Sequence, residues 1–233
     1  MTSFTIDRRF RGPEDSGNGG YSCGMVARFA TGDTEVTLRR PPPLDRPLTV
    51  QPDGSRVLVF DGEDLVAEAE SAEWDLAVPE APTLAEAEAA ARRFAGFERH
   101  AFTTCFVCGT ARDPGDGLRI FAGPVPGRDL VACPFTPGAS LPVEDGMLAT
   151  EMVWSLLDCP GAWAVDRHAE HNPVVLGRMA ARVVRRVPAG GTYLATGWAI
   201  GRDGRKLFSG TALFAADGTL HGYARQTWIV IAA

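Results

Sequence analysis

The first half of the chain contains the stretch Asp61-Gly62-Glu63-Asp64-Leu65-Val66-Ala67-Glu68-Ala69, and the second half contains the similar stretch Asp217-Gly218-Thr219-Leu220-His221-Gly222-Tyr223-Ala224, with one residue of slippage. Both begin with an Asp-Gly pair, and glycine at this place accepts the positive φ that tight hairpin turns require. The spacing is far longer than the roughly 20 to 50 residues of a solenoid repeat. The match therefore predicts two copies of one small domain.

Apolar runs surround both stretches in the same order. A glycine-containing turn opens each half, Asn18-Gly19-Gly20 in the first and Asp145-Gly146 in the second, and each turn precedes an apolar segment of helical character, residues 23–30 and 147–165. The runs that follow are rich in β-branched residues and predict antiparallel strands. These runs are residues 35–40, 48–51, 56–60 and 65–71 in the first half, and 177–187, 192–200, 206–215 and 220–231 in the second.

Two prolines in residues 76–82 interrupt the strand pattern between the halves. The next residues, Thr83-Leu84-Ala85-Glu86, have the spacing of a helix capping box, so a helix is predicted over 84–97. We expect an N-terminal domain over residues 1–75, a linker with this connector helix over 76–100, and a C-terminal domain over 101–233.

Composition and charge exclude several classes of protein. With 233 residues and 45% hydrophobic content, the chain has the composition of an ordinary globular protein. Its net charge of −6 and pI near 5.3 do not provide the positive field that would attract nucleic acids or anionic membranes. No run approaches the roughly 20 apolar residues of a membrane span, and the first residues do not resemble a signal peptide, so a cytoplasmic location is expected. Five cysteines without a secretion signal predict reduced thiols.

Two motifs carry a resemblance to a known family. Cys105-Phe106-Val107-Cys108-Gly109, followed by Gly117-Leu118-Arg119-Ile120, resembles the opening of hotdog domains in the phenylacetyl-CoA thioesterase-like group. The segment Leu156-Leu157-Asp158-Cys159-Pro160-Gly161-Ala162-Trp163-Ala164 resembles the part of that group's central helix where an acidic residue lies at the acyl-CoA site. The resemblance implies an α+β double hotdog, with two antiparallel sheets that each wrap a central helix, and an acyl-CoA thioesterase that uses neither metal nor organic cofactor.

The chain departs from that group in two ways. The frequent His-Gly-Gly before the central helix is absent, and Asp158 follows the Asp145 turn by thirteen residues (158 − 145) instead of about nine. These departures keep two other functions open: a non-catalytic protein that binds acyl-CoA or lipid, and a hotdog hydratase or dehydratase.

Hydrolysis of a thioester needs a carboxylate that activates water or attacks directly, and donors that stabilise the developing oxyanion. We expect Asp158 to supply the carboxylate, with its pKa raised by apolar neighbours, and the Asn18–Gly20 turn of the other half to face it. The predicted catalytic residues are Asp158 and Asn18. The predicted oxyanion-binding or substrate-binding residues are Gly19, Gly20, Tyr21, Asp145, Gly146 and Trp154.

A zinc site is a second possibility for Cys105 and Cys108, with His100 and Cys133 as candidates to complete it. A single Cys-x-x-Cys pair is an incomplete signal, so the sequence predicts no metal. The size of the acyl group depends on which of Met152, Trp154, Phe135 and Trp198 point inward. A fused pair of hotdog units can close its own sheet, so both a monomer and a homo-oligomer fit.

Overall fold

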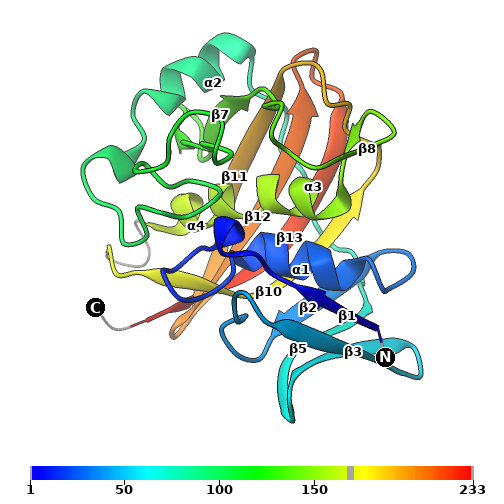
Figure 1. Ribbon diagram of the computed structural model, residues 1–233. Coiled ribbons are helices and arrows are strands. Elements are labelled where there is room, and N and C mark those ends of the chain that lie inside the picture. Colours follow the sequence, from blue (N-terminus) through cyan, green and yellow to red (C-terminus); the bar gives the residue numbers. More distant parts are fainter. Residues whose placement is uncertain (1, 167–170, 232–233) are drawn as a thin grey trace.

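The computed structural model describes residues 2–166 and 171–231, and its main feature is one antiparallel sheet of eleven strands (Figure 1). The strand order is β1-β3-β4-β5-β2-β10-β13-β12-β11-β7-β6. A separate hairpin pairs β8 (Val143–Glu144) with β9 (Met147–Leu148). The strands of the main sheet are β1 (Thr2–Thr5), β2 (Thr34–Leu38), β3 (Pro47–Asp53), β4 (Arg56–Asp61), β5 (Asp64–Ser71), β6 (Gly123–Pro124), β7 (Val131–Phe135), β10 (Val174–Val183), β11 (Tyr193–Asp203), β12 (Lys206–Ala215) and β13 (Leu220–Val230).

The two halves of this sheet repeat one strand order. Read from the outside inward, the N-terminal half is β1-β3-β4-β5-β2, and the C-terminal half, beyond the short β6, is β7-β11-β12-β13-β10. The halves meet where β2 pairs with β10 and Val36 lies opposite Met179. The prediction of two separate sheets is therefore wrong. Pairing β2 with β10 satisfies backbone groups that would otherwise line two exposed edges.

The two similar stretches of sequence occupy equivalent places in the halves. Asp61-Gly62 forms the turn between β4 and β5, and Asp217-Gly218 forms the turn between β12 and β13. Gly62 and Gly218 have φ of 62° and 86°, which glycine adopts at no steric cost. The short match in sequence thus marks the corresponding hairpin of each half.

Helices α1 (Gly19–Ala27) and α3 (Thr150–Leu156) lie side by side, and α4 (Cys159–Val165) packs on β11 and β12 (Figure 1). The predicted helical segment 147–165 begins later than expected. Asp145 and Gly146 form the β8–β9 turn, with φ of 52° and 73°, so α3 begins only at Thr150. The segment is broken between α3 and α4, which confirms the kink or end near Asp158 or Cys159 that Pro160 predicts.

The helix predicted from its capping box is α2 (Leu84–Ala91). The Thr83 side chain accepts a hydrogen bond from the Glu86 backbone, and the Glu86 side chain accepts one from the Thr83 backbone, which confirms the predicted start. The helix ends earlier than predicted, and a 3-10 turn, η2 (Ala95–Phe97), follows. No helix in residues 2–166 or 171–231 is both long and apolar enough to cross a bilayer.

Helix α2 covers the face of the C-terminal half opposite α4. Successive side chains of a strand point to opposite faces, and Leu194 and Trp198 of β11 pack with Ala87 and Ala90 in one cluster, while Tyr193 belongs to the main core. The predicted connector helix therefore packs on one half of the sheet.

Candidate functional site

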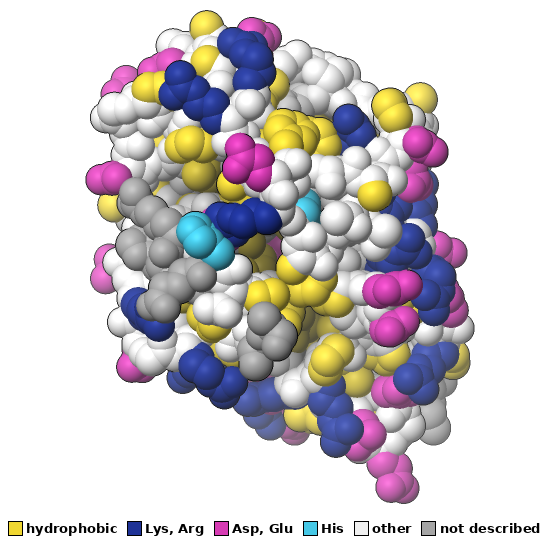
Figure 2. Space-filling view, turned by 90° about the vertical axis from the view of Figure 1, so that its left-hand side faces the viewer, with side chains coloured by type: hydrophobic (Ala, Val, Ile, Leu, Met, Phe, Trp, Pro, Cys, Tyr) yellow, Lys and Arg dark blue, Asp and Glu magenta, His cyan; other side chains and the backbone are white. Residues whose placement is uncertain are grey.

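A cavity of about 540 Å³ opens where the two halves of the chain meet. Its walls come from the start of α1, residues 99–108 and the start of α4, together with the first residues of β10 and the last residues of β13. Figure 2 shows a hollow with hydrophobic side chains inside it and basic side chains and a histidine near its edge. The apolar lining includes Leu38, Phe102, Ala162, Trp163, Val174, Leu176, Trp228 and Ile231.

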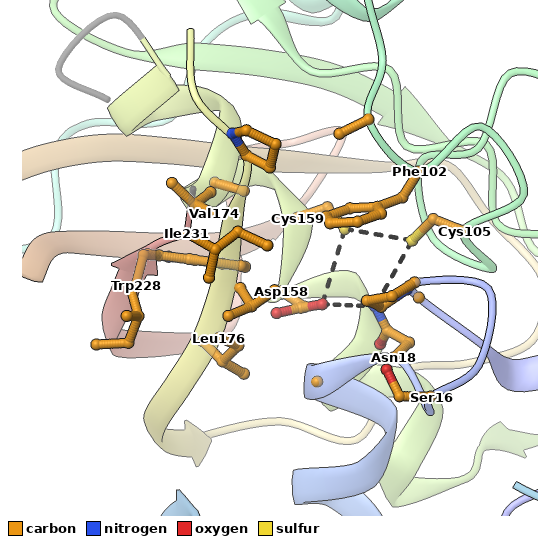
Figure 3. A pocket seen from close by; sticks show the side chains of 18 of the residues that line it. Ser16, Asn18, Phe102, Cys105, Asp158, Cys159, Val174, Leu176, Trp228 and Ile231 are labelled. Atoms are coloured by element: carbon orange, nitrogen blue, oxygen red, sulfur yellow. Dashed lines mark hydrogen bonds between the residues drawn. The ribbon is translucent and has the colours of Figure 1, made fainter. Parts of the chain in front are cut away.

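Asp158 lies at the break between α3 and α4 and borders this cavity. Its φ of −79° and ψ of −80° differ from helical values, and Pro160 follows within the first turn of α4, where the missing N–H of proline costs no helical hydrogen bond. Because the helix breaks here, the Asp158 side chain points toward the start of α1 (Figure 3). Asp158 is nevertheless only 1% exposed.

Buried polar side chains of β12 and β13 hold this break. Thr211 Oγ1 donates to the Leu157 carbonyl at 2.7 Å, and Gln226 Nε2 donates to the carbonyls of Leu157 and Asp158 at 2.7 and 3.0 Å. Gln226 Oε1 in turn accepts from Ser209 Oγ at 2.9 Å. These bonds satisfy carbonyls at the end of α3 and fix the backbone of Asp158 to the sheet. Sequence reasoning missed Gln226, whose strand carries no motif that marks it.

Replacing Gln226 with leucine tests this support. Gln226→Leu removes the two hydrogen bonds that Nε2 donates and leaves the buried carbonyls of Leu157 and Asp158 without this partner. The free energy of unfolding should therefore fall by about 1–3 kcal/mol. Urea unfolding measures the change. Gln51→Leu, on an exposed stretch of β3, is the matched control and should unfold at the wild-type midpoint. Equal midpoints for Gln226→Leu and the control would contradict the role of Gln226.

Asn18 joins the N-terminal half to Asp158. As the N-cap of α1, its Oδ1 accepts a hydrogen bond from the Tyr21 backbone at 2.9 Å, which directs its Nδ2 outward. Nδ2 donates to Asp158 Oδ2 at 2.7 Å and to Cys105 Sγ at 3.7 Å. The other carboxylate oxygen, Oδ1, has no hydrogen-bond partner among the described residues and points toward the cavity (Figure 3). The two residues predicted to face each other thus lie in direct contact.

The surroundings of Asp158 favour its neutral form. Burial, together with the charge of Cys105, raises the pKa of Asp158 to about 7, and hydrogen bonds from Asn18, Gly20 and Cys159 limit the rise. The direction agrees with the prediction from its apolar neighbours. With this pKa, the carboxyl can hold or accept a proton near neutral pH.

The first turn of α1 approaches Asp158 closely because it starts with two glycines. A Cβ on Gly20 would lie 2.4 Å from Asp158 Cβ and 2.8 Å from the Trp154 carbonyl oxygen. A Cβ on Gly19 would lie 2.6 Å from Leu176 Cβ, on the cavity wall. Only glycine therefore lets the backbone N–H groups of this turn reach the carboxyl and the cavity.

Four predicted binding residues lie elsewhere. Tyr21 is buried and stacks on Phe10, with ring centroids 4.0 Å apart, and Trp154 is buried on α3; neither borders the cavity. Asp145 and Gly146 also lie outside it, because they form the β8–β9 turn. The geometry therefore assigns these four residues to the core and to a turn.

All five cysteines are free thiols, and three of them meet beside Asp158. Cys105, Cys108 and Cys159 have Sγ atoms within 4.8 Å of one another. His100 and Cys133, the candidates to complete a zinc site with Cys105 and Cys108, are not part of this cluster. His100 Nε2 lies 3.0 Å from the Cys108 carbonyl oxygen and Nδ1 accepts from the Phe102 backbone, while Cys133 lies on β7. Sequence reasoning missed Cys159, although it directly follows Asp158.

No protein-family model and no curated protein matches this sequence. Solved structures do match its fold. A putative thioesterase from Novosphingobium aromaticivorans is 14% identical with a TM-score of 0.63, and the match covers 99% of this chain and 95% of that one. An acyl-CoA thioesterase II from Mycobacterium marinum is 15% identical with a TM-score of 0.59, covering 99% and 93%.

A protein of unknown function with a hotdog fold from Alicyclobacillus acidocaldarius also matches, at 11% identity and a TM-score of 0.54, covering 99% of this chain and 93% of that one. At these identities the matches establish the fold. The resemblance to hotdog thioesterase-like proteins is therefore confirmed at the level of the fold, over nearly the whole chain.

Proposed function

We propose that this protein hydrolyses an acyl-CoA thioester in the cavity beside Asp158. The observation that carries the proposal is the geometry of the buried Asp158 carboxyl, which can ionise near neutral pH. Asn18 of the other half binds one of its oxygens, and the second oxygen points toward the apolar cavity. The thioesterase structures of the same fold support this choice of reaction.

Each part of the site has a role in this reaction. The Asp158 carboxylate takes a proton from water as the water oxygen attacks the thioester carbonyl, and the C–S bond then breaks to give a carboxylic acid and the CoA thiol. Gly19 lines the cavity at the positive end of α1, and its backbone N–H is the proposed donor to the oxyanion. Asn18 is a positioning residue, because its amide is occupied by Asp158 and the cap of α1.

The cavity suits the two ends of such a substrate. Its apolar wall accommodates an acyl chain, and Arg39, Arg40 and Arg99 line it and can bind CoA phosphates. Each arginine pairs with an acidic side chain, and the Arg40–Asp64 pair is more than half exposed on both sides. Exposed pairs are weak, so a phosphate can replace the carboxylate of Asp64.

We further propose that the halves, residues 1–75 and 101–233, are two fused hotdog units with one working site at their junction. The repeated strand order and the corresponding hairpins support this. Asn18 comes from one unit and Asp158 from the other.

Release of free thiol from a panel of acyl-CoAs, with chain lengths from acetyl to long acyl, tests the proposed function. We expect turnover of at least one member. Acyl-CoAs that raise the melting temperature without any hydrolysis would contradict it and indicate a binding protein. A single turnover in ¹⁸O-labelled water separates the two chemical routes, because label enters the Asp158 carboxyl only if that carboxylate attacks the thioester directly.

Filling the cavity should discriminate among substrates. Val174→Trp places a large ring on the apolar wall, so KM for long acyl-CoAs should rise at least about tenfold, as expected for a loss of roughly 1.4 kcal/mol of binding. KM for acetyl-CoA should change less. Val183→Trp, at the exposed opposite end of the same strand, is the control. Equal changes for both chain lengths would show that the acyl chain does not lie along Val174.

A further inference from the structure

The thiols of Cys105, Cys108 and Cys159 form a buried cluster next to Asp158 that the proposed hydrolysis does not use. Figure 3 shows two of them in a ring of contacts with Asn18 and Asp158. Cys105 Sγ lies 3.9 Å from Cys159 Sγ, and Cys159 Sγ lies 3.7 Å from Asp158 Oδ2. All three cysteines are at most 5% exposed.

From this cluster we infer that the three sulfurs bind one Zn²⁺ ion, which joins the Cys105–Gly109 loop to the start of α4. In a tetrahedral site with Zn–S bonds of about 2.3 Å, two sulfurs lie about 3.8 Å apart. The Cys105–Cys159 separation is close to this value at 3.9 Å, and Cys108 Sγ lies within 4.8 Å of both sulfurs, so metal binding would require only small side-chain movements. Three soft thiolates select zinc over magnesium or calcium.

A tight turn at Gly109 fixes the loop that carries Cys105 and Cys108. The Gly109 N–H donates to the Cys105 carbonyl at 2.8 Å, and a Cβ on Gly109 would lie 2.4 Å from that oxygen, so the turn requires glycine. Cys105 Sγ, held by this turn, accepts a hydrogen bond from Asn18 Nδ2 at 3.7 Å.

A second observation concerns the Trp163 side chain beside Cys108. The indole N–H of Trp163 is buried without a hydrogen-bond partner among the described residues and lies near the Cys108 thiol. A metal-bound thiolate at Cys108 would accept this hydrogen bond, and ligands of this kind are commonly held by such donors. Cys105, Cys108, Cys159 and Asp158 all line the cavity, so a metal ion can reach the cluster from it.

Metal analysis of the full chain tests the site. Protein produced with added zinc and purified anaerobically without chelator should contain about one zinc per chain. After the zinc is exchanged for Co²⁺, the spectrum should show sulfur-to-cobalt charge transfer and the visible bands of tetrahedral cobalt. Wild-type protein that takes up neither metal would overturn the inference, as would a disulfide between two of the three cysteines in freshly purified protein.

Serine variants assign the ligands. Cys105→Ser, Cys108→Ser and Cys159→Ser should each weaken zinc binding at least about 100-fold in competition with a chromophoric chelator, more than is typical for the loss of an outer-shell partner. Cys23→Ser and Cys133→Ser are matched controls, because both thiols are equally buried but lie outside the cluster, and should bind zinc as wild type does.

Wild-type affinity in the Cys105, Cys108 and Cys159 variants would overturn the assignment. If these variants do not fold, the cobalt spectrum of the wild type still decides, because its charge-transfer intensity reports the number of thiolates. Metal content and thiol release are measured separately, so failure of the zinc site is distinguished from failure of the proposed hydrolysis.

Discussion

Asp158→Asn lowers kcat for hydrolysis of the best acyl-CoA by roughly 100- to 10,000-fold, the range expected when a positioned general base or nucleophile is lost. The substitution keeps the size of the side chain and an oxygen that can accept the bond from Asn18. It removes the ionisable group whose free oxygen points into the cavity. Binding of the acyl group should therefore persist while turnover is lost, and steady-state thiol release together with substrate-induced shifts in melting temperature measures both.

Asp203→Asn is the control for this substitution, because Asp203 is exposed in the β11–β12 turn and does not line the cavity. It should retain wild-type kcat and KM. Full activity in Asp158→Asn would show that another group activates water. A parallel loss of kcat and of folded protein would assign Asp158 a structural role only.

Gly20→Ala lowers both stability and activity. Alanine normally stabilises a helix relative to glycine by roughly 0.5–1 kcal/mol. Here the added Cβ would lie 2.4 Å from Asp158 Cβ and 2.8 Å from a backbone oxygen of α3, so α1 must move away from α3. We expect the free energy of unfolding to fall by about 1–3 kcal/mol, as for other overpacked cores, and kcat to fall at least about tenfold because Asp158 is displaced.

Gly138→Ala provides the comparison for this second variant. No atom lies within 4 Å of a Cβ added at Gly138, and this residue is not among the glycines with positive φ. Its unfolding midpoint and kcat should match those of wild type. A Gly20→Ala variant that is more stable than wild type and fully active would contradict the close contact of α1 with Asp158.

The strands of this protein were legible in its sequence because their signal is local. β-branched runs bounded by Asp-Gly turns predicted β4, β5, β12 and β13 to within a residue or so at most ends, and the Thr83–Glu86 box located the start of α2. The pair Asn18 and Asp158 was also expected, from the resemblance of short motifs to hotdog proteins. Asp145-Gly146 misled, because the same dipeptide that can precede a helix also makes a hairpin turn.

The sequence alone thus predicted most strands of the two halves, the start of α2, the two corresponding Asp-Gly hairpins and one acid worth testing. Only the tertiary structure decided that β2 and β10 join the halves into one sheet, that Gln226 holds the α3–α4 break, and that Cys159 meets Cys105 and Cys108. Turns and strand patterns depend on neighbours within a few residues. The site depends on groups as far apart as Asn18, Cys105, Asp158 and Gln226, which approach one another only when both halves pack around a shared core.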